Sequence, residues 1–136
     1  MFLKILLSLS LLMLGGIIYL GYRNEALLLF EWAHFLGLDA IVHLFRTYAS
    51  HYLLSSWIIY SLPDGMWLLS YMLIIDLLWG ESDISQNFWL YILPFIAIIS
   101  ELSQLIVPSH GTFDFLDLCC YFIAIILFKT LKYLKL

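Results

Sequence analysis

Polar and acidic side chains gather in one short stretch of an otherwise apolar chain. Glu101 and Gln104 lie three residues apart near the end of one long apolar run, and Asp114 and Asp117 lie three apart at the start of the next. A spacing of three places each pair on one face of a helix. Carboxylates and amides accept hydrogen bonds and bind cations, and carboxylates also serve as acids or bases. This stretch is therefore the candidate site.

The composition identifies an integral membrane protein. Of the 136 residues, 64% are hydrophobic and 12% charged, and the mean hydropathy is +1.00, whereas soluble domains carry roughly 25% charged residues. No basic patch with interleaved aromatic residues points to a nucleic acid partner. Cys119 and Cys120 are adjacent in an apolar run, without the spacing of a redox or zinc motif. The sequence therefore indicates no cofactor.

Four apolar runs predict an all-α membrane domain over residues 1–136. Each run approaches the roughly 20 residues that cross a bilayer. The first is longer than the apolar core of a usual signal peptide and no A-x-A site follows it, so it is predicted to remain as an anchor. The four transmembrane helices are expected at about 2–22, 64–80, 87–107 and 114–134.

The segment 24–62 is predicted to form interfacial or re-entrant helices between spans one and two. Its first part mixes charged and aromatic residues, as in helices that lie in the membrane interface. Gly37 is expected to end that helix, and Pro63 to close a short apolar helix before Asp64 caps the next one. A fifth span over 41–62 is the alternative, which would bury Arg46 and His51 in lipid.

The lysines predict the orientation. Lys4 precedes the first span, and Lys129, Lys132 and Lys135 end the last. Because basic residues favour the cytoplasmic side, both termini are expected in the cytoplasm, with the protein in the cell inner membrane. Asp76, one turn from the end of span two, is expected to reach headgroup water.

This topology gathers polar residues at the outward ends of the spans. Because an ionised group facing lipid is costly, they should face one another or a water-filled cleft. Plainer interpretations stay open: Asp114 can simply cap a helix, and Glu101, about two turns inside its span, can make a structural hydrogen bond. The candidate cluster is Asp64, Glu101, Gln104, His110, Asp114 and Asp117.

The same stretch resembles a known family. E-L-S-Q-L at 101–105, followed by V-P-S-H-G-T-F-D-F-L-D-L at 107–118, is similar to the signature of VanZ-like proteins, which are small multi-pass membrane proteins. Some members are associated with resistance to the antibiotic teicoplanin. Glu101, Gln104 and Asp117 match the family pattern. The family's turn arginine is replaced here by His110 or Gly111, and its following asparagine by Tyr121.

Three functions fit these residues. The first is a binding protein for a lipid headgroup, a lipid-linked envelope precursor or a glycopeptide. The second is a membrane hydrolase or transferase, with Glu101 or Asp117 as general base or with Glu101, His110, Asp114 and Asp117 gathering Mg²⁺ or Mn²⁺. The third is a scaffold whose acids only fix helix pairing. No serine has a partnered histidine, and the oligomeric state is open.

Overall fold

Apolar runs separated by polar turns fold into helices, as the sequence predicts. The computed structural model describes residues 2–79, 84–107 and 111–134; 80% of these residues are helical, and none of them lies in a strand. The helices are α1 (Phe2–Tyr22), α2 (Leu28–Phe35), α3 (Asp39–Ala49), α4 (Ser56–Tyr60), α5 (Leu62–Trp79), α6 (Ile84–Ser103) and α7 (Phe115–Tyr133).

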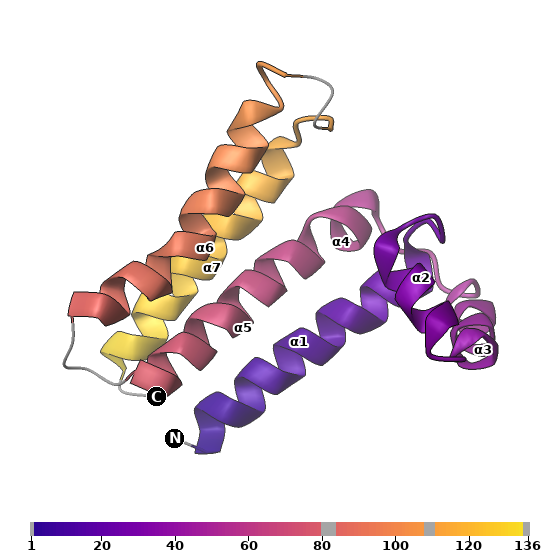
Figure 1. The fold of residues 1–136 in the computed structure, drawn as a ribbon, viewed down its shortest axis with the longest axis horizontal. Coiled ribbons are helices and arrows are strands. Elements are labelled where there is room, and N and C mark those ends of the chain that lie inside the picture. Colours follow the sequence, from indigo (N-terminus) through magenta and orange to yellow (C-terminus); the bar gives the residue numbers. More distant parts are fainter. Residues whose placement is uncertain (1, 80–83, 108–110, 135–136) are drawn as a thin grey trace.

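Helix α5 lies at the centre of the arrangement. It packs against α1 on one side and against α6 and α7 on the other, while α2 and α3 lie beside the C-terminal end of α1 (Figure 1). The start of α1 and the end of α7 lie at the same end of the molecule, which we call the terminal end. The opposite end, where α1 and α6 finish and α5 and α7 begin, is called the acidic end.

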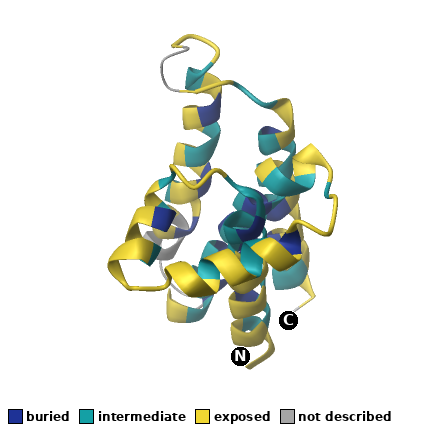
Figure 2. Ribbon diagram, turned by 90° about the vertical axis from the view of Figure 1, so that its right-hand side faces the viewer, coloured by how far each residue is buried: buried dark blue, intermediate teal, exposed yellow. Residues whose placement is uncertain are grey.

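The core is formed where α5 meets its neighbours. Figure 2 shows that most positions on the outside of the helices are exposed. Gly65 allows α5 to approach α7 closely, because a Cβ added there would lie 2.9 Å from Cys120 Cβ. Gly15 likewise allows α1 to approach the Trp67 ring of α5, because a Cβ added at Gly15 would lie 2.5 Å from Trp67 Nε1. The buried apolar cluster is Leu68, Leu69, Met72, Leu73, Leu90, Ala124 and Phe128.

Among the described residues, two helices are long and apolar enough to cross a membrane. They are α1, with 21 residues, and the helical stretch Ser56–Trp79, with 24. Only 11% of the α1 window is buried inside the molecule, against 44% of the second. The α1 surface therefore consists mainly of apolar side chains without protein partners, such as Leu6 and Met13, which are 52% and 64% exposed.

The second span begins earlier than the sequence predicts. Pro63 does not close a helix; it lies in the first turn of α5, and Asp64 lies in that turn instead of capping it. Backbone hydrogen bonds continue from Ser61 N to Trp57 O, so α4 leads directly into α5. Proline is tolerated in a first turn because the amide that it lacks would have no partner inside the helix.

The helix predicted as the third span ends earlier than the sequence predicts. Helix α6 stops at Ser103, and the chain then tightens through hydrogen bonds from Gln104 N to Glu101 O and from Leu105 N to Leu102 O. Such i to i+3 bonds are typical of the last turn of a helix. Glu101 thus lies in the final turn of α6, and the prediction that it is two turns deep is wrong.

The segment between α1 and α5 is helical, and Gly37 ends α2 as predicted. Gly37 has a φ of +70°, its amide bonds His34 O, and the Leu38 amide bonds Ala33 O, which is the Schellman pattern of a glycine-terminated helix. Arg46 of α3 donates to Leu20 O and Arg23 O, both at 2.9 Å. Through these bonds α3 satisfies carbonyls at the end of α1.

Asp76 lies inside the bundle. The prediction that this carboxylate reaches headgroup water is wrong. It is 7% exposed, and its two oxygens accept bonds from Lys4 at 2.8 Å and Lys132 at 2.9 Å. One carboxylate on α5 thus joins the start of α1 to the end of α7. This contact fixes the terminal end of the molecule.

The Asp76→Asn substitution tests that contact. Two lysines lose their counter-ion while the side-chain volume is kept, so the midpoint of thermal unfolding in detergent should fall by about 5–10 °C, the equivalent of about 2 kcal/mol. Lys129→Ala is the control, because Lys129 is exposed and makes no ion pair among the described residues. Equal midpoints for the two variants would contradict a stabilising role.

Candidate functional site

A cavity of about 680 Å³ opens at the acidic end, where four parts of the chain meet. The end of α1, the α4–α5 junction, the last turns of α6 and the start of α7 each contribute side chains. The volume is within the range of ligand-binding pockets, roughly 300–1,000 Å³. The lining residues are Arg23, Tyr60, Asp64, Leu93, Ile96, Ala97, Ser100, Glu101, Gln104, Thr112, Asp114, Asp117 and Tyr121.

Glu101 joins α6 to the start of α7. It is 4% exposed, and its Oε1 accepts a bond of 2.6 Å from the Asp114 backbone amide while Oε2 accepts one of 3.1 Å from Gln104 Nε2. Both carboxylate oxygens therefore have protein donors. The structural hydrogen bond to a neighbouring helix that the sequence left open is present.

Asp114 is the N-cap of α7. Its Oδ1 accepts a 2.8 Å bond from the Leu116 amide, which satisfies an amide at the helix start. The turn before it passes close to α6, since Gly111 has a φ of +135° and a Cβ added there would lie 3.1 Å from Gln104 Oε1. Capping thus accounts for one oxygen of Asp114.

Asp64 and Asp117 are the carboxylates of the cavity that make the fewest hydrogen bonds with the protein. Asp64 makes no ion pair or side-chain hydrogen bond with the described residues, and buried Asp117 Oδ1 has no hydrogen-bond partner among them. The Ser61 hydroxyl lies near the Asp117 carboxyl, yet Ser61 Oγ also lacks a hydrogen bond of good geometry among the described residues. Both aspartates can therefore accept donors from a ligand.

Arg23 and Tyr60 are cavity residues that the sequence reading missed. The Arg23 guanidinium lies 5.2 Å from the centre of the Tyr19 ring and 5.1 Å from that of Tyr60, within the range of a cation–π contact. Its Nε is buried without a hydrogen-bond partner among the described residues. The cation thus comes from the end of α1, 78 positions from Glu101 (101 − 23), and no local spacing reveals it.

Five of the six predicted cluster residues lie around this one cavity: Asp64, Glu101, Gln104, Asp114 and Asp117. The sixth, His110, is outside the described residues. Within the described part of the chain, no group of three or more histidine, cysteine or acidic residues is placed to hold a metal ion. The arrangement offers hydrogen-bond acceptors, one cation and aromatic faces for a bound molecule.

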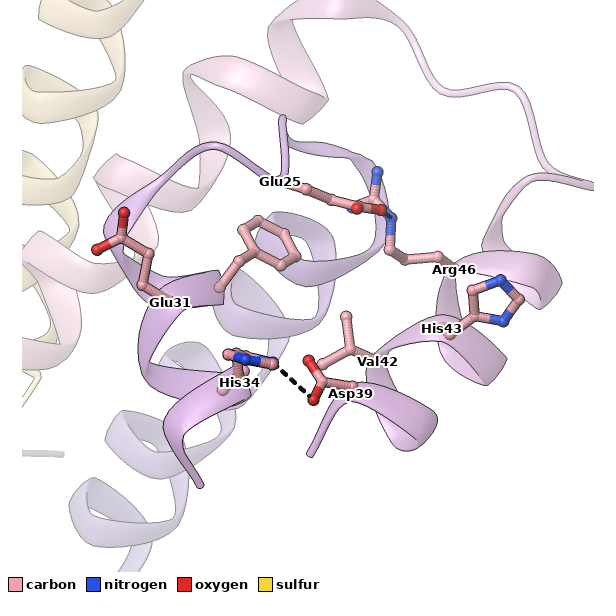
Figure 3. Close-up of a pocket in the computed structure, with 9 residues that line it drawn as sticks. Glu25, Glu31, His34, Asp39, Val42, His43 and Arg46 are labelled. Carbon is pink, nitrogen blue, oxygen red and sulfur yellow. Dashed lines mark hydrogen bonds and ion pairs between the residues drawn. The ribbon is translucent and has the colours of Figure 1, made fainter. Parts of the chain in front are cut away.

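A second hollow, of about 360 Å³, lies between α2 and α3 (Figure 3). Its charged groups largely pair within it: His34 Nδ1 is 2.9 Å from Asp39 Oδ2, and Arg46 Nε is 2.8 Å from Glu25 Oε1. His34 and Asp39 are both well exposed. These contacts describe an exposed polar surface on which four of the charged or titratable side chains pair with one another.

Comparison of the chain with protein-family models, with curated proteins and with solved structures finds no match. The assignment of function therefore depends on the cavity itself.

The Glu101→Gln substitution tests the junction of α6 and α7. Glutamine has a single acceptor oxygen, so either the Asp114 amide or the Gln104 amide loses its partner, and stability should fall by about 1–3 kcal/mol. Amide hydrogen exchange at Asp114 and Leu116 should accelerate. Glu31→Gln is the matched control, because Glu31 is exposed on α2. Unchanged exchange in Glu101→Gln would refute the role given to Glu101.

Proposed function

We propose that this chain is a four-span, VanZ-like protein of the cell inner membrane that binds a membrane lipid, or a lipid-linked envelope precursor, by its headgroup. The observation that carries the proposal is the cavity at the acidic end. Its lining changes from polar at the outer end to apolar deeper in the bundle. A headgroup and the first part of its acyl chains have the same order of polarity.

The residues of α6 and its end that line the cavity support this interpretation. Gln104, Glu101 and Ser100 line its outer part, and Ala97, Ile96 and Leu93 line it one to three turns deeper. These positions recur at the spacing of a single helix face. Ile96 is 53% exposed and Leu93 39%, so the apolar part of the cavity wall is accessible from the side of the bundle. A lipid can enter from there.

The helix directions support four spans. Lys4 and Lys132 both reach Asp76, so α1 and α7 have their terminal residues at one end, and α1, α5, α6 and α7 connect the two ends. Three lysines of the described residues, namely Lys4, Lys129 and Lys132, belong to the terminal end, against Arg23 and Arg46 at the other. By the positive-inside rule the terminal end is cytoplasmic and the cavity opens outward.

The segment of α2 and α3 fits the outer membrane interface. Leu28, Trp32 and Phe35 are 58%, 58% and 90% exposed and lie on one face of α2. Glu25 and Asp39 line the polar hollow between α2 and α3. An apolar aromatic face beside a charged face is typical of helices that lie in the interface.

Three residues that carry the resemblance to the VanZ-like pattern lie together. Glu101, Gln104 and Asp117, which match the family pattern, all line the cavity, and Arg23 supplies there a guanidinium that the turn lacks. A glycopeptide ligand, and hence a role in antibiotic resistance, is the other ligand class that a binding screen would test. The headgroup proposal does not depend on it.

Filling the cavity tests the binding function. Ala97→Trp places an indole in the apolar part of the cavity and should lower the fraction of protein that retains a lipid in native mass spectrometry by roughly tenfold. Ile99→Trp is the matched control on the exposed side of the same helix, where Ile99 is 48% exposed, and should retain lipid as the wild type does. Equal retention in both variants would count against a lipid site in this cavity.

Cysteine labelling in intact cells tests the topology. With Cys119 and Cys120 replaced by alanine, Ile106→Cys, at a position that is 83% exposed, should react with a membrane-impermeant maleimide. Tyr133→Cys, at a position that is 87% exposed at the terminal end, should react only after the membrane is opened. Labelling of both from outside would contradict the four-span orientation.

A further inference from the structure

The cavity at the acidic end holds charged groups of both signs, and Arg23, Asp64 and Asp117 interact electrostatically there without forming an ion pair in direct contact among the described residues. Four carboxyl groups line it, those of Asp64, Glu101, Asp114 and Asp117, against the single guanidinium of Arg23. Glu101 has donors on both oxygens and Asp114 caps α7. Asp64, Asp117 and Arg23 are therefore the charged groups that remain available to a ligand.

The positions of these three groups are set by the surrounding fold. The Arg23 backbone carbonyl accepts a bond from Arg46 at 2.9 Å, and its guanidinium lies between the Tyr19 and Tyr60 rings. Asp64 lies in the first turn of α5 and Asp117 in that of α7. The close approach of Gly65 to Cys120 brings these two turns together. The cation and the two carboxylates are thus held on opposite elements of one cavity.

The charge pattern excludes simple ligands of one sign. An anion would meet Arg23 but would be repelled by Asp64 and Asp117, both of which interact electrostatically with Arg23 as well. A cation would satisfy the carboxylates and leave the buried Arg23 Nε without an acceptor. A ligand that satisfies only one sign of charge therefore forgoes the hydrogen bonds that the other groups could make. A ligand that carries both charges satisfies all three groups.

From this pattern we propose that the cavity recognises the ammonium–phosphate pair of an ethanolamine-type phospholipid headgroup, an inference that rests on the lipid-binding function proposed above. The phosphate binds Arg23, whose planar guanidinium suits phosphate oxygens. The primary ammonium donates to Asp64 and Asp117. A choline headgroup has no N–H donor for Asp117 Oδ1, and a glycerol headgroup has no cation, so both should bind less well.

The test is competition among lipids that differ only in headgroup. Full-length protein is incubated with equal amounts of phosphatidylethanolamine, phosphatidylcholine and phosphatidylglycerol of identical acyl chains, and bound lipid is measured by native mass spectrometry. The wild type should prefer phosphatidylethanolamine roughly tenfold, the effect of a charge-assisted hydrogen bond. Asp117→Asn should abolish the preference over phosphatidylcholine, and Asp64→Asn provides the same test from α5. Glu31→Gln is the matched control and should keep it.

The outcomes separate this inference from the binding function itself. Preference for phosphatidylcholine or phosphatidylglycerol, with lipid still lost in Ala97→Trp, would overturn the ethanolamine inference and leave the lipid-binding function standing. Absence of any lipid that depends on the cavity would overturn both. Soluble phosphoethanolamine should displace the lipid only weakly because it leaves the apolar wall unfilled; displacement at equal concentration would support the same headgroup chemistry but assign it to a soluble compound.

Discussion

An ionised side chain inside an apolar bundle must meet a partner, and this constraint shapes both ends of the molecule. At the terminal end, Asp76 accepts bonds from Lys4 and Lys132, so the carboxylate that would otherwise be isolated becomes the contact that joins α1, α5 and α7. At the acidic end the carboxylates outnumber the cations. There the fold leaves acceptors and one guanidinium facing a cavity.

The two ends therefore differ in what their charges do. At the terminal end, Asp76 forms ion pairs with lysines of the same protein. These ion pairs stabilise the packing of helices whose other surfaces are apolar and largely exposed. In the cavity, Glu101 and Asp114 are also used internally, because they fix the end of α6 and the start of α7. This arrangement fixes the start of α7, so that Asp117 lines the same cavity as Asp64 and Arg23. Two carboxylates of the cavity are thus used within the fold, while Asp64 and Asp117 form no ion pair in direct contact among the described residues.

Local patterns in the sequence predict the helices well and the long-range partners poorly. Apolar runs, Gly37 and the cap at Asp114 each depend on neighbouring residues, and the structure agrees with them. Pro63 misled the prediction because a proline can begin a helix as well as end one. The Lys4–Asp76 and Lys132–Asp76 contacts join residues 72 and 56 positions apart, and Arg23 enters the cavity from another helix. No spacing encodes such contacts, so they required the fold.

Contacts between a bound lipid and the cavity rings test the central claim most directly. Tyr60 and Tyr121 line the cavity, whereas Trp32 and Tyr133 are 58% and 87% exposed elsewhere. Nuclear Overhauser effects are measured between the headgroup methylenes of phosphatidylethanolamine and aromatic ring protons of the protein in lipid nanodiscs. The account predicts strong effects at Tyr60 and Tyr121. Effects confined to Trp32 and Tyr133 would contradict it.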